Sequence, residues 1–258
     1  MKDLNIKNKI ALITGASSGI GKETAFLFGK EGAKLMLVAR DKNRLDEVAS
    51  NIGTDGGEAE VFPADVTNQE KMKECVRQTE GIYGGIDILV NAAGIIASGT
   101  IEDTKMEDWD YMMDINLRAV FNLTQLVIPS LIKRKGNVVN VSSVTGVRAF
   151  PGVLAYCVSK AGLDQFTRCV ALELAPKDVR VNAVNPGVTF TELHRRGGMD
   201  EEKYAAFLEH SKTTHPTGRV GQPKEIAELI LFLASPHAGW ITGVTYSIDG
   251  GRGQTCAR

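Results

Sequence analysis

Short, almost wholly apolar runs alternate with amphipathic segments along most of the chain. Runs of this kind predict strands that are buried on both faces. They lie at residues 9–14, 34–39, 60–63, 86–90, 137–141, 179–184 and 244–248. The amphipathic segments have the three- and four-residue spacing of helices that pack on one side. These predicted helices cover residues 21–30, 43–52, 69–80, 154–174 and 225–234, with one further long helix inside residues 109–132.

The regular exchange of strand and helix predicts an α/β fold with a parallel sheet and helices on both faces. We expect residues 1–258 to form a single domain, since no linker, repeat or low-complexity block interrupts the pattern. Right-handed crossovers would bring the carboxyl ends of the strands to one edge, where such sheets bind ligands. One long segment, residues 190–223, is irregular and rich in charge and glycine. We interpret it as a lid over that edge; an ordinary surface excursion is the alternative.

The composition is that of a globular protein, with 43% hydrophobic and 24% charged residues. Because 31 acidic residues balance 30 basic ones, a dedicated nucleic-acid-binding role is not expected. The 4 cysteines and 4 histidines are scattered, without a Cys-x-x-Cys or His-Glu-x-x-His motif, so we expect reduced thiols and no metal site. No apolar run approaches the ~18 residues of a membrane span, and the first residues do not form a secretory signal. A cytoplasmic protein is therefore expected.

A glycine-rich turn joins the first predicted strand to the first helix, with the sequence Thr14-Gly15-Ala16-Ser17-Ser18-Gly19-Ile20-Gly21. Glycines let the backbone turn tightly and approach a ligand closely, and the following helix offers free N–H groups to an anion. The pyrophosphate of a dinucleotide suits such a turn, and a plain tight turn is the alternative. Because no Gly-Lys-Ser/Thr follows, a P-loop nucleotide triphosphatase is excluded.

The second predicted strand ends in Val38-Ala39-Arg40, where dinucleotide sites hold the adenosine ribose. Ala39 cannot hold a ribose diol, whereas Arg40 can make a forked, charge-assisted contact with a 2′-phosphate. Asp41 follows and offers a carboxylate instead, and a solvated loop position for Arg40 is a further alternative. These residues favour NADP(H) as cofactor over NAD(H), and both stay open.

Tyr156 and Lys160 lie four residues apart near the start of a predicted helix and so share one face of it. A free phenol has a pKa near ~10, which is too high for proton transfer at neutral pH. We expect the Lys160 ammonium to lower the pKa of Tyr156 toward the useful range. The pair alone arises readily by chance; its place after a fifth strand that ends in Ser142-Ser143 gives it weight.

Together these motifs resemble those of the short-chain dehydrogenase/reductase family. They follow one another in that family's order: Thr14 to Gly21, Asn91-Ala92-Ala93-Gly94, Asn116, Ser143, Tyr156 with Lys160, and Asn185-Pro186-Gly187. The resemblance covers residues 7–251 and implies a Rossmann-type, doubly wound, seven-stranded parallel sheet with helices on both faces. It also implies NAD(P)(H) as hydride carrier for an enzyme that interconverts a carbonyl compound and an alcohol.

The resemblance implies a role for each matched residue. Tyr156 would be the acid/base at the reacting oxygen, Lys160 would bind the nicotinamide ribose, and Ser143 would hydrogen-bond the substrate oxygen. Ser142 is its less favoured neighbour, and Asn116 would help to hold a water chain. The remaining expected cofactor contacts come from Gly15, Ser17, Ser18, Gly19, Ile20, Gly21, Arg40, Asp65, Val66, Asn91, Ala92, Gly94, Pro186, Gly187, Thr189 and Thr191, besides Tyr156 and Lys160. Two positions depart from the family pattern: Ala92 replaces a usual Asn, and Thr189 a frequent Ile or Val.

The substrate pocket is expected to be mostly apolar and to suit a hydrophobic ketone, diketone, steroid-like or acyl compound. Its expected contacts are Ser143, Tyr156, Ile95, Phe150, Val153 and Leu193, with Ser98, Met199, Tyr204 and Phe207 as further lining candidates. The main hypothesis is an NADP(H)-dependent carbonyl reductase or alcohol dehydrogenase; an NAD-dependent alcohol or hydroxysteroid-type dehydrogenase is the alternative. A non-enzymatic nucleotide-binding sensor on the same scaffold is disfavoured, because all four catalytic positions are filled. The resemblance implies a homotetramer or dimer.

Overall fold

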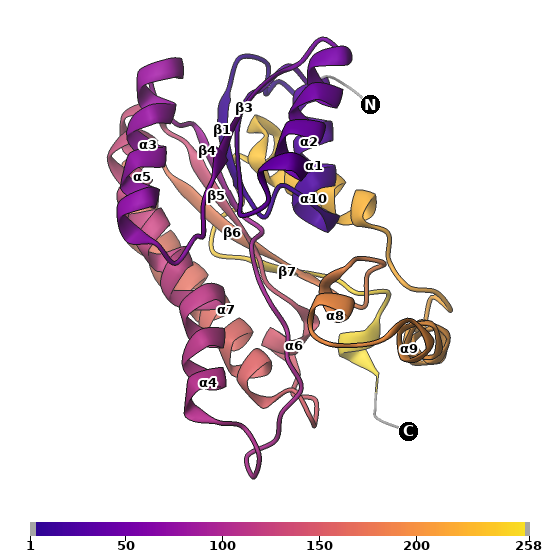
Figure 1. The fold of residues 1–258 in the computed structure, drawn as a ribbon. Coiled ribbons are helices and arrows are strands. Elements are labelled where there is room, and N and C mark those ends of the chain that lie inside the picture. The colour runs from indigo at the N-terminus through magenta and orange to yellow at the C-terminus, as the bar shows by residue number, and fades with distance from the viewer. Residues whose placement is uncertain (1–3, 256–258) are drawn as a thin grey trace.

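Seven parallel strands form one continuous sheet in the computed structural model, which describes residues 4–255. The strands are β1 (Ile10–Thr14), β2 (Lys34–Ala39), β3 (Glu58–Pro63), β4 (Ile88–Asn91), β5 (Asn137–Val141), β6 (Arg180–Pro186) and β7 (Thr245–Ile248). Their order is β3-β2-β1-β4-β5-β6-β7 (Figure 1), which confirms the doubly wound sheet. The order reverses between β1 and β4, and open α/β sheets bind ligands at such a switch point.

Helices cover both faces of the sheet, as predicted (Figure 1). One face carries α1 (Gly19–Lys30), α2 (Lys42–Thr54) and α10 (Pro223–Ala234); the other carries α3 (Gln69–Tyr83), α5 (Ala119–Arg134) and α7 (Leu154–Leu174). Successive side chains of a strand point to opposite faces. In β1, Ala11 and Ile13 pack under the first layer and Leu12 under the second, so the apolar run supplies both cores at once.

Side chains at the helix starts explain why these segments turn helical where they do. The carboxylate of Asp41 accepts a hydrogen bond of 3.1 Å from the N–H of Arg44 at the start of α2. Asn68 caps α3 in the same way, accepting 3.0 Å from the N–H of Lys71. Such caps satisfy N–H groups that a helix leaves unpaired at its first turn.

The predicted long helix is continuous from Met106 to Arg134 and contains a π-helical turn. It consists of α4 (Met106–Met113), the π turn η1 (Asp114–Arg118) and α5. The extra residue of a π turn re-aims side chains, and here Ile115 and Asn116 are buried. By length and composition alone this helix could cross a membrane, so the expectation that no segment approaches that size was wrong. Half of its apolar window is buried inside the protein, as in the core helix of a globular domain.

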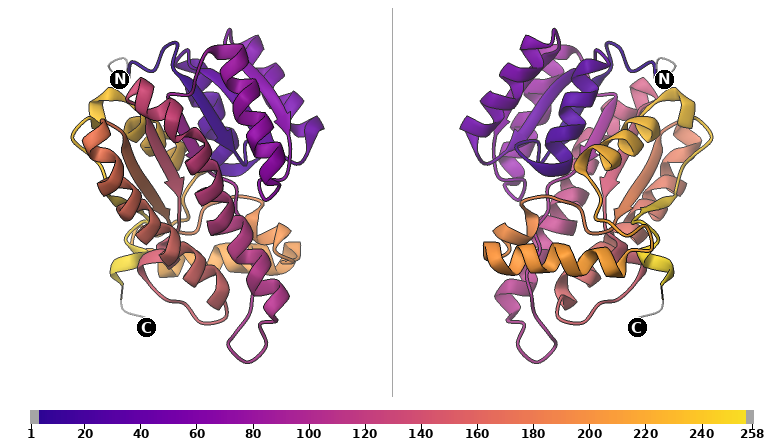
Figure 2. Two further views of the ribbon diagram at one scale, coloured as in Figure 1. Left: turned by 90° about the vertical axis from the view of Figure 1, so that its left-hand side faces the viewer. Right: turned by 90° about the vertical axis from the view of Figure 1, so that its right-hand side faces the viewer.

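A further group of helices gathers beyond the carboxyl ends of the strands, opposite the end where the described chain begins (Figures 1 and 2). They are α6 (Val144–Val147), α8 (Leu193–Arg196), α9 (Glu201–Thr214) and the 3₁₀ turn η4 (Arg252–Gln254), whereas the 3₁₀ turns η2 (Ala175–Lys177) and η3 (Pro236–Ala238) lie elsewhere. The lid segment, residues 190–223, is therefore not irregular as expected. Its helix α9 buries only Tyr204 and Ser211, so it lacks the apolar stripe that announces a helix in a sequence.

Within residues 4–255, no group of three or more His, Cys, Asp or Glu side chains is placed to hold a metal ion. Cys75, Cys157 and Cys169 are free thiols, and Cys256 lies outside the described residues.

Candidate active site

The glycine-rich turn is fastened to the end of β4 by Thr14. Its hydroxyl oxygen accepts hydrogen bonds from the backbone N–H groups of Ala92 (3.1 Å) and Ala93 (3.2 Å). Gly15 has a φ of +66°, and a Cβ there would lie 2.8 Å from the Ala92 backbone. Only glycine allows this approach, so the turn and the Asn91–Gly94 segment pack backbone against backbone at the switch point.

The first turn of α1 opens toward this packed backbone. Ser18 is the N-cap residue of α1 but makes no side-chain capping bond, so the helix's leading N–H groups stay available to an anion. A Cβ on Gly21 would lie 2.4 Å from the Gly15 carbonyl oxygen, and one on Gly19 would lie 3.3 Å from the Thr191 side chain. The backbone of the glycine-rich turn thus carries no side chain at Gly15, Gly19 and Gly21, where a pyrophosphate would lie against it. These residues fit a dinucleotide.

Tyr156, Lys160 and Ser143 meet at the carboxyl end of β5. Tyr156 and Lys160 are buried on the same side of α7, and the Lys160 Nζ lies 5.7 Å from the centre of the Tyr156 ring. Ser143 caps α6, accepting 3.1 Å from the N–H of Thr145, and shares a hydrogen bond with the Tyr156 side chain. Ser142 instead donates to the Lys160 carbonyl at 3.3 Å, which makes it part of the packing.

The expected effect of Lys160 on the acidity of Tyr156 was wrong for this structure. Burial raises the pKa of Tyr156 to about 12, and the hydrogen bond with Ser143 opposes that rise only in part. The Lys160 ammonium donates to the Val141 carbonyl at 2.8 Å and not to the phenol. Burial also lowers the pKa of Lys160 to about 8, with Asp164 opposing. Tyr156 is therefore a protonated phenol at neutral pH, beside a lysine that still carries its charge.

Asn116 is held rigidly by the π turn. Its side-chain oxygen accepts 2.9 Å from the Ile95 N–H, and its amide nitrogen donates to the Ile95 carbonyl (3.0 Å) and to the hydroxyl of Ser159 (3.1 Å). The Ser159 hydroxyl in turn donates 2.8 Å to the Tyr156 carbonyl. These bonds tie the segment after β4 to the first turn of α7, so Asn116 fixes the spacing between the two.

The Asn91 side chain is committed to the interior of the sheet. Its amide donates 2.9 Å to the Asn140 side-chain oxygen, and the Asn140 amide donates 2.9 Å to Thr167. All three are buried. Asn91 therefore braces the central strands, and any contact with a ribose has to come from the backbone of the Asn91–Gly94 segment.

The adenosine end of the expected cofactor site is exposed and charged. Arg40 lies 4.0 Å from the Asp65 carboxylate; the Arg40 side chain is 62% exposed and the Asp65 side chain 38%. The Asp41 carboxylate caps α2 with one oxygen and lies 3.4 Å from Arg44 Nε with the other. The two arrangements leave a guanidinium directed to solvent at the end of β2, as a 2′-phosphate contact needs.

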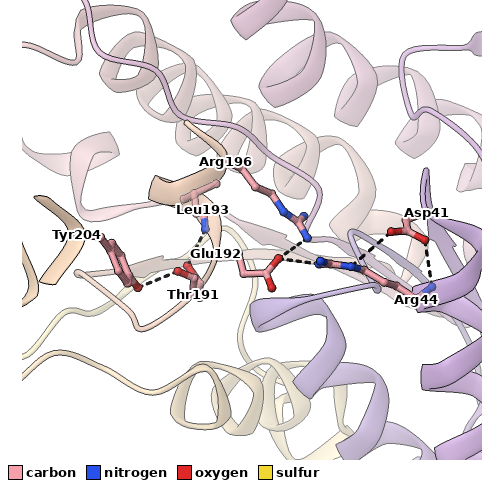
Figure 3. A network of polar contacts seen from close by, with 7 residues as sticks. All are labelled: Asp41, Arg44, Thr191, Glu192, Leu193, Arg196 and Tyr204. Atoms are coloured by element: carbon pink, nitrogen blue, oxygen red, sulfur yellow. Dashed lines mark hydrogen bonds and ion pairs between the residues drawn. The ribbon is translucent and has the colours of Figure 1, made fainter. Parts of the chain in front are cut away.

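A second arginine reaches from α2 to the lid segment, residues 190–223 (Figure 3). Arg44 Nη1 lies 2.7 Å from Glu192 Oε2, and Arg196 Nη2 lies 2.5 Å from the same oxygen. Beside them the Tyr204 hydroxyl donates 2.8 Å to the Thr191 carbonyl. Tyr204 is thereby a packing residue inside the lid and not a pocket-lining one.

The segment that follows β6 is shaped by short backbone pairing. Gly221 N–H donates to the Val188 carbonyl (2.9 Å), and Phe190 N–H donates to the Gly221 carbonyl (3.0 Å), which makes a parallel bridge centred on Thr189. In this pattern the N–H and C=O of Thr189 itself point to the opposite side. They are thus directed away from Gly221, as a contact with a carboxamide requires.

Apolar side chains surround Tyr156 on the substrate side. Ile95 and Val153 pack with Met112 and Tyr156 in one cluster. Phe150 lies outside it, and the guanidinium groups of Arg148 and Arg252 are 5.7 and 4.9 Å from its ring centre. The structure thus brings Ile95 and Val153 to the tyrosine and places Phe150 at a more polar position.

Comparisons with known proteins place the whole chain in one family. The family model described as enoyl-(acyl carrier protein) reductase matches residues 15–252. A 3-oxoacyl-(acyl-carrier-protein) reductase of Thermotoga maritima is 41% identical over 249 residues, covering 96% of this chain and 99% of that protein. The chain belongs to the short-chain dehydrogenase/reductase family. Members of this family are oxidoreductases that bind a nicotinamide cofactor.

Two other members of the short-chain dehydrogenase/reductase family show how far the likeness extends. An NAD-dependent glycerol dehydrogenase of Listeria innocua is 38% identical, covering 97% of this chain and 96% of that protein. A Caenorhabditis elegans short-chain dehydrogenase/reductase solved with cofactor superposes with a TM-score of 0.93 at 36% identity, covering 98% of this chain and 97% of that one.

Sequence reasoning missed several residues that shape this short-chain dehydrogenase/reductase site. Thr14 was part of the quoted motif but not a predicted site residue. Glu192 and Arg44 gave no signal, because an exposed acid in a lid and an arginine in a helix are ordinary in sequence. Asp164 lies buried one turn beyond Lys160 and accepts 2.7 Å from the Asn185 amide. Its i,i+4 spacing from Lys160 was the one available sign.

Proposed function

We propose that this protein reduces a carbonyl compound to an alcohol with NADPH as hydride donor. The observation that carries the proposal is the buried, protonated phenol of Tyr156, hydrogen-bonded with Ser143 and packed against apolar side chains at the sheet's switch point. The protonated phenol is the form that carbonyl reduction uses, because it gives its proton to the oxygen as negative charge develops there. Reduction of a carbonyl requires such a donor, whereas alcohol oxidation requires the phenolate.

The position of each residue in the site determines its proposed role. The cofactor, when bound, supplies hydride to the carbonyl carbon. Ser143 would hydrogen-bond the carbonyl oxygen, and Tyr156 would give that oxygen its proton as negative charge develops there. Lys160 would hold the nicotinamide ribose with its ammonium group, and Asn116 would keep the segment after β4 in place. Preformed donors of this kind lower the barrier because they need no reorganisation during the reaction.

NADP(H) is proposed over NAD(H) because of Arg40 and Asp41. The exposed guanidinium offers a forked contact to a 2′-phosphate, and Asp41 is occupied as a helix cap. NAD-dependent oxidation of an alcohol is the second candidate, since the Listeria innocua relative is named an NAD-dependent glycerol dehydrogenase.

The proposed substrate is an acyl compound with a keto group near its polar end. Ile95 and Val153 supply the apolar wall at Tyr156, and the Thermotoga maritima relative is named a 3-oxoacyl-(acyl-carrier-protein) reductase. An apolar wall beside two fixed hydrogen-bonding groups fits a carbonyl carried on a hydrocarbon chain.

The deciding experiment follows cofactor absorbance with acetoacetyl thioesters, simple ketones and alcohols, each with NADPH or NADH. We expect NADPH-dependent reduction of the keto thioester. Tyr156→Phe should lower turnover at least about a hundredfold while NADPH binding persists, since a general acid contributes about 10²–10⁴. Tyr111→Phe, at an exposed tyrosine, is the matched control. Unchanged turnover in Tyr156→Phe would falsify the mechanism.

We further propose a homotetramer or dimer in the cytoplasm, with a small carbonyl compound as partner and neither nucleic acid nor membrane. Support comes from exposed apolar side chains on α5 and α7, namely Phe121, Val158 and Leu172, together with the fully exposed Trp240. Helices α5 and α7 lie on the same face of the sheet, and exposed apolar surface is typical of contacts between subunits. Native mass measurement checks the assembly, and a monomer at micromolar concentration would count against it.

A further inference from the structure

His215 follows α9 and turns its imidazole into the protein, with 3% of the residue exposed. Its Nδ1 lies 2.6 Å from the Ser211 carbonyl oxygen. Its Nε2 lies 3.1 Å from the backbone nitrogen of Val188. One ring thus bridges the last turn of the lid helix and the segment that follows β6.

These two contacts fix where the proton of the imidazole is. A carbonyl oxygen can only accept, so Nδ1 must carry a hydrogen; a backbone N–H can only donate, so Nε2 must be bare. His215 is therefore held neutral with its proton on Nδ1. A second proton on Nε2 would face the Val188 N–H and break that hydrogen bond.

The contact with Val188 sets the position of Thr189. Val188 is held on one side by Nε2 of His215 and on the other by the N–H of Gly221, which donates to its carbonyl. A Cβ on Gly187 would lie 2.8 Å from the same Nε2, so the ring also sets how closely this backbone approaches α9. The Thr189 backbone that faces the other way is placed by these bonds together.

We propose that neutral His215 is a positioning residue for the nicotinamide end of the cofactor, acting through the Val188 and Thr189 backbone. This inference rests on the proposed function, because it takes Thr189 to face the carboxamide. His215 touches neither substrate nor cofactor. It acts by holding a peptide N–H that would otherwise turn away and release the loop from its bridge with Gly221.

The hydrogen bond between His215 and the Val188 N–H depends on pH, because charged groups surround the imidazole. From α9 it faces Ser211 and Thr214, from the end of β7 the carboxylate of Asp249, and from η4 the guanidinium of Arg252. Arg219 and Glu225, paired at 2.6 Å, line the adjoining cavity of about 300 Å³. Burial lowers the pKa of His215, and Arg252 lowers it further against the opposing Ser211 carbonyl and Asp249. Its ordinary pKa is ~6.5, so the ring charges only below that pH.

The test uses the full chain with His215→Leu, which removes the acceptor, and His215→Gln, which keeps an acceptor that does not titrate. His210→Gln, at an exposed histidine of α9, is the matched control. We expect His215→Leu to weaken NADPH binding about tenfold, the loss typical of a buried N–H left without its acceptor. Adenosine 2′,5′-bisphosphate, which lacks the nicotinamide, should bind as in the parent. His215→Gln should bind NADPH within about threefold of the parent. The parent should lose affinity for NADPH below pH 6.5, where the imidazole becomes charged, and His215→Gln should not show this loss.

A second measurement does not depend on activity or variants. Nitrogen NMR of the parent protein should show one histidine fixed as the Nδ1–H tautomer across neutral pH. Equal losses of NADPH and of the bisphosphate, or unchanged NADPH binding in His215→Leu, would overturn the inference. If His215→Leu fails to fold, the tautomer and the pH profile of His215→Gln decide. Failure of the proposed function is distinguishable, because the parent itself would then bind no NADPH.

Discussion

Arg44 and Glu192 are joined by a 2.7 Å ion pair although 148 positions separate them in the chain. The pair connects the start of α2 with the start of the lid, across the edge where the glycine-rich turn lies. Arg44 lowers the pKa of Glu192, and Glu192 raises that of Arg44. Because both side chains are nearly half exposed, the pair contributes at most about 1 kcal/mol to folding. We expect it to act instead on how long residues 190–223 stay closed over a bound cofactor.

Glu192→Gln should speed cofactor release several-fold while leaving the unfolding free energy within about 0.5 kcal/mol of the parent. The substitution keeps the size of the side chain but removes the charge that holds Arg44 and Arg196. Stopped-flow fluorescence of bound NADPH measures the release. Glu209→Gln, which breaks an ion pair with Lys212 inside α9, is the control. Equal release rates in all three proteins would mean that the pair does not restrain the lid.

Cofactor affinity should fall as the pH rises through about 8, because burial lowers the pKa of Lys160 to about 8. Below that pH the side chain is an ammonium that can donate to ribose hydroxyls; above it the charge is gone. Titrating NADPH binding between pH 6.5 and 9.5 checks this. Lys160→Gln should bind weakly and without this pH dependence. A parent affinity that stays level to pH 9.5 would show that the bound ribose keeps Lys160 charged.

Arg40→Ala should raise KM for NADPH about tenfold or more and leave KM for NADH nearly unchanged. A hydrogen bond to a charged group is worth about 1.5–3 kcal/mol, and about 1.4 kcal/mol corresponds to tenfold. Steady-state kinetics with both cofactors measures the difference. Arg77→Ala, at an exposed arginine of α3, is the control. A parallel loss with NADH would remove the 2′-phosphate argument.

Asn140→Ala should cost about 1–3 kcal/mol of unfolding free energy, because two buried hydrogen bonds are lost. The Asn91 amide would keep only a 3.5 Å contact with Thr124, and the Thr167 hydroxyl only its bond to the Leu163 carbonyl. Urea denaturation gives the value. Asn122→Ala is the contrasting variant, since the Asn122 amide nitrogen already has no hydrogen-bond partner. That variant should be close to neutral; comparable losses in both would assign the effect to side-chain volume.

The strands could be predicted because each leaves a local mark in the sequence, and the residues proposed as catalytic were chosen from marks of the same kind. An apolar run such as Leu35 to Val38 can only be buried on both faces, and a tight glycine turn after a strand has few uses. The helices of residues 190–223 left no such mark. Helix α9 is set by its Asp200 cap and by the tertiary packing of Tyr204, neither of which changes the period of the sequence.

The acidity of Tyr156 shows why electrostatics is harder to predict than position. Spacing placed Lys160 beside the ring correctly, but the sign of the pKa shift depends on how dry the site is. Here burial outweighs the hydrogen bond with Ser143, and the ammonium is turned to Val141. Similarly, Asn91 was recognised from its motif, while its partner Asn140 could be found only once β4 and β5 were paired.

The hydrogen-bonded row of Asn91, Asn140 and Thr167 also limits how β4 and β5 can pair as the chain folds. β4 and β5 are short and rich in valine, isoleucine and leucine, so on hydrophobic grounds several alignments of the two would be nearly equivalent. Asn91 and Asn140 are opposite each other in the native register. Because side chains alternate, a shift of either strand by one residue would move one of the two amides to the opposite face of the sheet. Both amides would then be buried among apolar side chains without this hydrogen bond. The hydrogen bond between Asn91 and Asn140 thus specifies the register in which β4 and β5 pair.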